Sequence, residues 1–148
     1  MPKLMKSMVV ISRCQAAYKN SLLEGGELSS CHSSFVFAIC KNPGLTQEEI
    51  SRRTCLNKST VARRIDYLEE RGFVERRASE ADRRVFLVYP TEKMLAVYPQ
   101  MREITGEWNR LISEGISEEE LSVFRSVLYR LEERARELVG FSGGGANE

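Results

Sequence analysis

Long apolar runs, histidine and net charge are all scarce in this sequence. No stretch approaches the roughly 18 consecutive apolar residues of a membrane-spanning helix, so no membrane partner is expected. The basic segment 1–7 is followed by a short apolar run at residues 8–11, which cannot form a signal-peptide core and has no small-residue cleavage site after it. We therefore expect a cytoplasmic protein.

The shortage of histidine and the spacing of the cysteines argue against an enzyme or a metalloprotein. His32 is the only histidine, and the spacings between Cys14, Cys31, Cys40 and Cys55 (17, 9 and 15 residues) fit no zinc-binding pattern. A glycine-rich phosphate loop and a Ser/His/Asp set are also missing. We expect no catalytic residue, no metal and no cofactor, and we expect the cysteines to be reduced and to fill packing positions.

The sequence does have an ordinary globular composition with an uneven distribution of charge. Its 148 residues are 42% hydrophobic and 29% charged, which corresponds to about one domain. The net charge is +1, but residues 1–44 and 45–90 carry +3 and +2, and residues 91–148 carry −4. Nine of the ten basic residues between Arg52 and Arg84 are arginine, which suits bidentate contacts to phosphate and guanine. A nearly neutral chain can therefore present one basic face.

Two helices and a helix-turn-helix are predicted in the first half. Apolar residues at steps of three and four predict a helix over 3–24, ended by a glycine pair, and a second helix over about 29–41. A Thr-x-x-Glu capping box starts a short helix over 46–54. Asn57 is then the predicted N-cap of a longer helix over 58–71, with its apolar residues on one face. A short helix, a tight turn and a longer helix form a helix-turn-helix.

A β-hairpin is predicted directly after this motif. Two β-rich runs, 73–77 and 83–89, bracket the polar turn-forming stretch 78–82. A hairpin in this position is a wing, and arginines flank its tip. The predicted fold class is mainly α with a small β-hairpin wing (α+β), a winged helix-turn-helix with N- and C-terminal dimerisation helices.

The last part of the chain predicts two long helices that need a partner. Thr91 caps the first, in which Pro99 predicts a kink, and a capping box at Ser117 starts the second. Apolar residues along both follow the alternating three and four steps of a coiled-coil seam. A compact winged lobe cannot cover these seams together with that of the first helix. We therefore expect the outer helices to pair with a second copy.

The expected organisation has three parts. Residues 1–26 and 91–140 form a helical dimerisation region, and residues 27–90 form the winged helix-turn-helix lobe. Residues 141–148 are expected to be a disordered tail, since they are rich in glycine.

Four groups of residues resemble the multiple-antibiotic-resistance regulator (MarR) family in order and spacing. They are Leu45-Thr46-Gln47-Glu48-Glu49-Ile50; Asn57-Lys58-Ser59-Thr60-Val61-Ala62-Arg63; Leu68-Glu69-Glu70-Arg71-Gly72-Phe73-Val74-Glu75-Arg76; and Asp82-Arg83-Arg84 with Pro90-Thr91-Glu92-Lys93. The resemblance implies a bacterial, homodimeric transcriptional regulator that binds double-stranded DNA. It implies that helix 58–71 enters the major groove of a near-palindromic operator and that the wing, 73–89, lies at the minor groove. It further implies a repressor or an activator, and we expect a repressor released by a small molecule or an oxidant.

The candidate DNA contacts lie at the start of helix 58–71 and on the wing. Arg63 can bridge O6 and N7 of guanine, and Lys58 with the N-terminal amides suits a phosphate. By the family pattern, Arg83 contacts the minor groove, and Asp82 pairs with Arg84 to hold the wing. The predicted set is Asn57, Lys58, Ser59, Thr60, Arg63, Arg64, Arg77, Arg83 and Arg84. Asp66 and Glu70 are outside it, because carboxylates repel phosphate.

The resemblance also implies a sensor near the junction of the lobe and the dimer body. A small aromatic effector is expected near Tyr18, Phe35 and Trp108. A thiol switch is the other candidate sensor, either at Cys14 with Tyr18 one turn on, or at Cys40 or Cys55, which flank the turn into the DNA-binding lobe. His32 is a further candidate. Ordinary core packing is the alternative for each of these residues.

A different class of function stays open from the residues alone. A winged helix can be a protein-interaction module without specific DNA binding, and its helix 58–71 would then expose apolar anchors. The outer face carries Ser59, Thr60 and Arg63 instead, with Tyr67 as the one exception. This composition favours DNA.

Overall fold

The computed structural model describes residues 2–141. Over this range the elements are α1 (Pro2–Leu22), the 3-10 turn η1 (Ser30–His32), α2 (Ser33–Lys41), β1 (Leu45–Thr46), α3 (Gln47–Thr54), α4 (Lys58–Glu70), β2 (Val74–Ala78), β3 (Phe86–Pro90), α5 (Glu92–Ile112) and α6 (Glu118–Val139). The mainly α fold with a small sheet agrees with the predicted class. The predicted disordered tail spans residues 141–148. Phe141 is described in the structure, and residues 142–148 lie outside the described residues.

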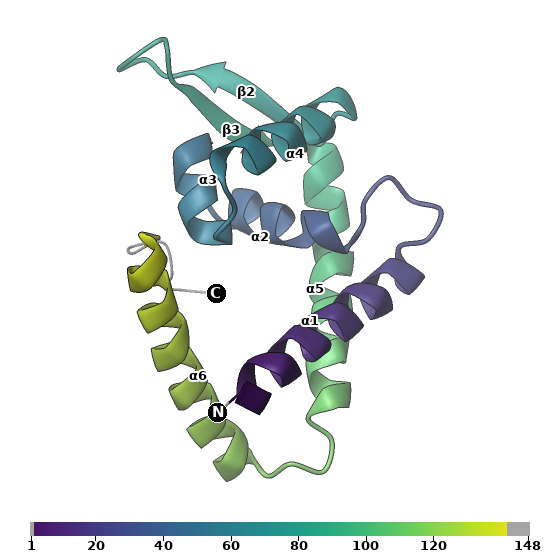
Figure 1. Ribbon diagram of the computed structural model, residues 1–148. Coiled ribbons are helices and arrows are strands. Elements are labelled where there is room, and N and C mark those ends of the chain that lie inside the picture. Colours follow the sequence, from purple (N-terminus) through teal and green to yellow (C-terminus); the bar gives the residue numbers. More distant parts are fainter. Residues whose placement is uncertain (1, 142–148) are drawn as a thin grey trace.

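Helix α5 connects the two ends of the molecule (Figure 1). One end carries α2, α3, α4 and the β2–β3 hairpin, and α1 crosses α5 nearer its other end. Helix α6 turns back from the far end of α5 and runs alone toward α3. Within residues 2–141, the helices are too short or too polar to span a bilayer.

The sheet contains one strand more than the sequence predicted. Its order is β1-β3-β2 with antiparallel pairing, and β1 pairs through Leu45 with Val88 and through Thr46 with Leu87. The β2–β3 hairpin is confirmed. Strand β1 escaped prediction because a two-residue strand has no periodicity, and its second residue is also the N-cap of α3.

The helix-start predictions are confirmed by hydrogen bonds. Thr46 Oγ1 accepts from the Glu49 amide at 3.1 Å, and Glu49 Oε2 accepts from the Thr46 amide at 2.7 Å. Asn57 Oδ1 accepts from the Thr60 amide at 2.8 Å. The second helix differs from the prediction because its first turn is the 3-10 turn η1. Helix α5 continues through Pro99.

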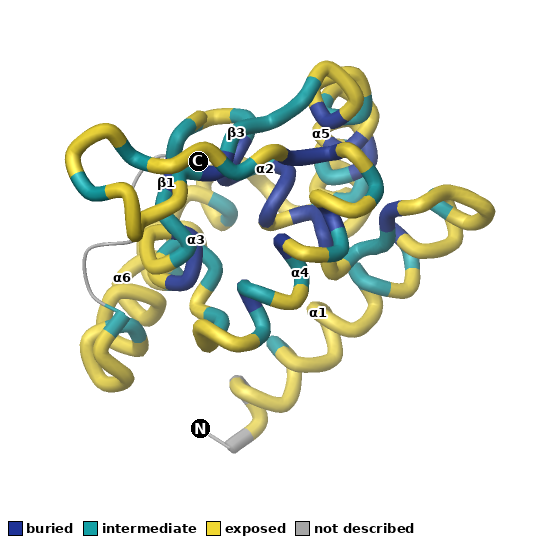
Figure 2. The backbone as a smooth tube through the Cα atoms, turned by 90° about the horizontal axis from the view of Figure 1, so that it is seen from above, coloured by how far each residue is buried: buried dark blue, intermediate teal, exposed yellow. Residues whose placement is uncertain are grey.

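The buried core belongs to the winged lobe and the half of α5 beneath it (Figure 2). The largest fully buried side chains are Phe35, Ile39, Ile50, Ile65, Leu68, Met94 and Met101. Burial of each such side chain stabilises the fold by about 1.5–3 kcal/mol. Among the described residues, α6 contributes no buried side chain.

Candidate nucleic-acid interface

The first turn of α4 is anchored on one side and open on the other. Val61, Ile65 and Leu68 are fully buried, which fixes the rotation of α4 against the core. The opposite side therefore presents Lys58 and Arg63, both exposed, and the Lys58 side chain is 79% exposed. The arrangement places cationic side chains and the N-terminal amides of a helix at one surface, which is how an anion such as a phosphate is bound.

Several residues of the predicted contact set have partners within the chain at the start of α4, including Lys58, whose Nζ atom lies 4.0 Å from Glu48 Oε1. Asn57 Oδ1 accepts from the Thr60 amide as the cap and also accepts from Ser59 Oγ at 2.9 Å. Arg64 donates from Nη1 to the carbonyl of Cys31 at 2.9 Å, which directs it toward η1. Among the described residues, Arg63 has one side-chain contact, 3.4 Å from Nη2 to Thr60 Oγ1, so its guanidinium is available to a ligand.

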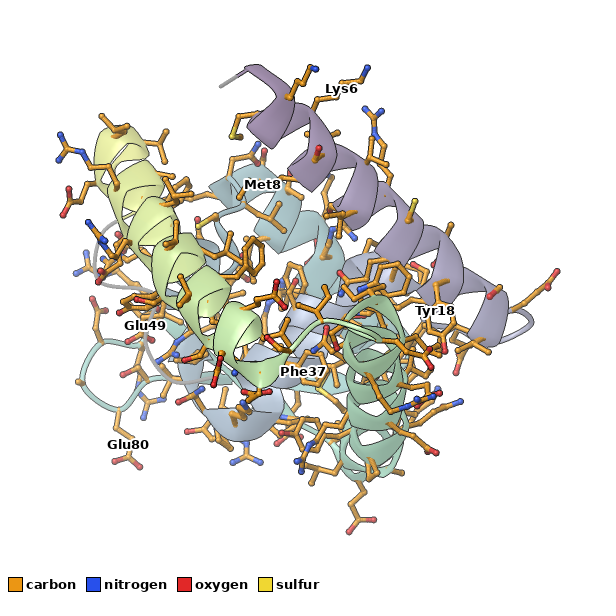
Figure 3. All side chains as sticks on the ribbon, turned by 90° about the horizontal axis from the view of Figure 1, so that it is seen from below. Lys6, Met8, Tyr18, Phe37, Glu49 and Glu80 are labelled. Carbon is orange, nitrogen blue, oxygen red and sulfur yellow. The ribbon has the colours of Figure 1, made fainter. Side chains whose placement is uncertain are left out.

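The wing presents a second group of arginines. Asp82 accepts from Nε of Arg84 at 3.1 Å and from the Arg84 amide at 3.0 Å, so the predicted Asp82–Arg84 pair is present. These hydrogen bonds lower the pKa of Asp82 and keep it ionised. Arg83 is exposed beside them, and Arg77 lies over the Tyr89 ring at 4.2 Å. Seen from below, Glu80 lies at the outer end of the wing loop (Figure 3).

Arg76 joins the wing to α4, and sequence reasoning missed it. Its side chain is 21% exposed and forms ion pairs with Asp66, at 2.6 Å, and with Glu69. Its Nε atom donates to Gln47 at 3.1 Å. The sequence indicated only that the Asp66 carboxylate would repel phosphate. In the structure its charge is neutralised by Arg76 of the wing. The spacing of Asp66 and Glu69, which lie on one face of a helix, followed by Arg76 on the next strand, could have indicated this ion-pair network.

Tyr67 is packed inside the lobe rather than offered to a partner. Its hydroxyl donates to the carbonyl of Glu27 at 2.5 Å. The His32 ring stacks on its ring at 4.7 Å between centroids, and the Arg71 guanidinium lies 3.6 Å from the ring centroid. The one apolar exception on α4 is thus engaged within the chain.

The predicted sensor residues lie in separate places. Tyr18 lies on α1 (Figure 3), and its ring centroid is 5.4 Å from that of Trp108 on α5. Phe35 is fully buried in the lobe, and His32 stacks on Tyr67. Cys14 is exposed on α1. The structure therefore brings Tyr18 and Trp108 together, with Cys14 one turn before Tyr18 on α1, and it places Phe35 and His32 in the winged lobe.

A cavity of about 250 Å³ lies elsewhere, between the end of α1, the following loop and α5. Lys93 lies at this cavity and pairs with Glu27 at 2.6 Å. It also donates to the carbonyl of Arg71 at 2.7 Å. The same lysine thus contacts the cavity and the residue that follows α4.

The cysteines are all free thiols. Cys14, Cys31 and Cys55 are exposed, and burial raises the pKa of the half-buried Cys40 to about 11. Within residues 2–141, no group of three or more His, Cys, Asp or Glu side chains could hold a metal ion.

Comparison with known proteins agrees with this geometry. Residues 29–85, which hold α3, α4 and most of the wing, match the model of the MarR family. The winged lobe of this chain is a MarR-family domain. Members of this family are transcriptional regulators, so the expectation of a regulator rather than an enzyme is confirmed.

Individual relatives and solved structures match most of the chain. It is 25% identical over 131 residues to the uncharacterized HTH-type transcriptional regulator YybA of Bacillus subtilis (strain 168), covering 88% of this chain and 87% of YybA. The crystal structure of the transcriptional regulator SlyA has a TM-score of 0.89 at 28% identity, covering 93% and 97%. Streptococcus pneumoniae FabT, solved in complex with DNA, has a TM-score of 0.78 at 24% identity, covering 93% and 98%, and shows the shared fold.

Proposed function

We propose that this protein binds a near-palindromic operator as a homodimer in the bacterial cytoplasm. Helix α4 enters the major groove, and the wing lies at the minor groove. One observation carries the proposal: the first two turns of α4 expose Lys58 and Arg63, while the opposite face of the helix is buried in the core. FabT, which shares the fold, is solved in complex with DNA, and this supports DNA as the ligand.

Within this proposal the predicted residues divide by their geometry. Lys58 and the α4 amides contact phosphate, and Arg63, with Ser59 and Thr60, contacts base edges. Arg83, Arg84 and Arg77 contact the minor groove and its backbone from the wing. Asn57 and Arg64 act indirectly, because their side chains hold the start of α4 and its position against η1.

The apolar surface of α1 and α6 supports the homodimer. Helix α6 exposes Phe124, Leu131 and Leu138 along its seam, and α1 exposes Val9 and Ile11. These side chains would leave a large apolar area in water on a single copy, and a second copy covers it. A symmetric partner also places two copies of α4 about one helical turn apart on DNA.

We further propose that the protein is a repressor released by a small molecule or an oxidant. The cavity beside Lys93 supports a small-molecule signal, because two residues that line it, Lys93 and Glu27, are hydrogen-bonded to α4 or to the residue after it. Lys93 bonds to the Arg71 carbonyl, and Tyr67 bonds to the Glu27 carbonyl. A ligand that displaces Glu27 from Lys93 would therefore loosen the support of α4. The three exposed thiols, Cys14, Cys31 and Cys55, support an oxidant as the alternative signal that releases the repressor.

The experiment that tests the function is selection of bound duplexes from a random DNA pool. The expected result is an enriched near-palindrome with half-sites about one helical turn apart and binding that falls steeply with salt. Addition of an aromatic carboxylate or of peroxide to the same assay tests the signal. A pool without enrichment, together with weak binding at low salt only, would contradict the proposal and favour the protein-interaction module.

A further inference from the structure

Helix α3 ends in a turn whose backbone carbonyl groups have no amide partner within the helix. Cys55 follows its last residue in the left-handed conformation, with φ of 54°, so the helix cannot continue. The last carbonyls of any helix lack partners within the helix and carry partial negative charge. The carbonyls concerned here are those of Arg52 and Arg53 in the last turn.

A guanidinium from α6 satisfies these carbonyls. Arg136 donates from Nη1 to the carbonyl of Arg52 at 2.9 Å and from Nη2 to that of Arg53 at 3.4 Å. Its Nε atom donates to Glu132, one turn earlier, at 2.8 Å. A cation at a helix C-terminus is favourable both as a hydrogen-bond donor and toward the helix dipole.

This contact is specific to one arginine of α6. The Arg136 side chain is 15% exposed, whereas that of Arg134 is 72% exposed and pairs only with Glu137 on the same helix. Among the residues that the structure describes, the hydrogen bonds from α6 to the winged lobe are those of Arg136.

The contact of Arg136 with α3 connects the far end of α6 to the lobe that α5 carries. Helices α5 and α6 diverge from the turn that joins them, and the far end of α6 comes close to α3 (Figure 1). Helix α5 carries the winged lobe through its packing on α2. Helix α6 carries the exposed seam that the second copy covers. Arg136 therefore joins the part that holds DNA to the part that holds the partner.

We propose that Arg136 is a positioning residue that sets the distance between the two recognition helices of the dimer. It does so by holding α3, which packs directly against α4, at the end of α6. Loss of this contact lets the angle between α5 and α6 vary, so the dimer accepts operators with a wider range of half-site spacings. This inference rests on the proposed dimeric DNA-binding function.

The test compares binding to the selected operator with binding to versions lengthened or shortened by one base pair. The wild-type protein and the matched control Arg134→Ala, which removes an equal charge from the same helix, should prefer the original spacing to the same extent. In Arg136→Ala the preference ratio should fall toward one, while affinity for a single half-site stays at the wild-type value. Arg136→Lys keeps the charge without the forked donor and should fall between them. A wild-type preference ratio in Arg136→Ala would overturn the inference.

Hydrogen exchange tests the contact without DNA and separates its failure from failure of the proposed function. In Arg136→Ala, amide exchange should become faster in the last turns of α3 and α6, and in Arg134→Ala it should not. Unchanged exchange in both segments of folded Arg136→Ala, verified by its thermal transition, would overturn the inference whether or not an operator is found.

Discussion

Arg76 of strand β2 donates a hydrogen bond of 2.6 Å to Asp66 of helix α4. The two residues belong to the two parts of the molecule that are proposed to contact DNA, the wing and the recognition helix. Glu69 and Gln47 also accept from the same guanidinium, so one side chain connects α3, α4 and the wing. The relative position of the two DNA-contacting elements therefore depends on a residue that need not contact DNA.

Replacement of Arg76 by alanine should loosen the wing without unfolding the lobe. The partly buried charged hydrogen bonds are worth about 1–2 kcal/mol, which should lower the thermal midpoint by several degrees. Operator affinity should fall as well, because the wing loses its fixed position. The control is Arg77→Ala, whose side chain is 60% exposed, and its thermal midpoint should stay close to wild type. An unchanged midpoint in Arg76→Ala would show that the network contributes nothing to stability.

Replacement of Arg63 by alanine should relax base specificity. A bidentate contact to guanine is worth about 1–3 kcal/mol of discrimination, so the variant should bind the operator about 5- to 150-fold more weakly. The loss should be concentrated at one base pair of each half-site in a mutated operator series. Arg102→Ala removes an exposed arginine from α5 as the control for net charge. Equal affinity of Arg63→Ala and the control would remove Arg63 from the contact set.

A charge in the α6 seam should dissociate the dimer. Phe124 is 53% exposed on the single chain, so it would be buried only by the partner. Phe124→Glu introduces a carboxylate into that interface and should shift the mass in sedimentation from dimer to monomer. Ser126 lies on the other side of α6, so Ser126→Glu should remain dimeric. A dimeric Phe124→Glu protein would place the interface elsewhere.

The stability of the lobe should fall in mild acid because of His32. Its Nδ1 atom accepts from the Ser29 amide at 3.0 Å, which only the neutral ring can do. Burial, with the positive charges of Arg64 and Arg71, lowers the pKa of His32 below 6.5. The unfolded chain therefore binds the proton first, so this contribution is complete above about pH 6.5 and is lost as pH falls through the folded value.

The variant His32→Asn isolates this effect, because it keeps an acceptor atom but does not titrate. Between about pH 7.5 and pH 5, its thermal midpoint should fall less than that of the wild-type protein. A parallel fall in the two proteins would show that the titration of other groups dominates.

Most helix boundaries could be predicted, because they depend on neighbouring residues. The cap at Asn57, the box at Thr46 and the glycine after α4 act within a few residues of chain, and each is present in the structure. The candidate DNA contacts at Lys58 and Arg63 follow from the same local pattern, since the buried face of α4 determines which side chains point outward. The strand β1 could not be predicted, because only its pairing with Val88 and Leu87 makes it a strand.

Tertiary structure decided which arginines bind the protein itself. Arg63, Arg64, Arg76 and Arg136 look alike as charges in the sequence, yet three of them donate to Cys31, to Asp66 or to the end of α3. These partners lie at sequence distances that no helical or strand period connects. Element type, caps and the family resemblance were thus encoded in short-range chemistry. The division of the basic residues between ligand and scaffold required the packed chain, because an arginine's role depends on which acceptor its guanidinium can reach.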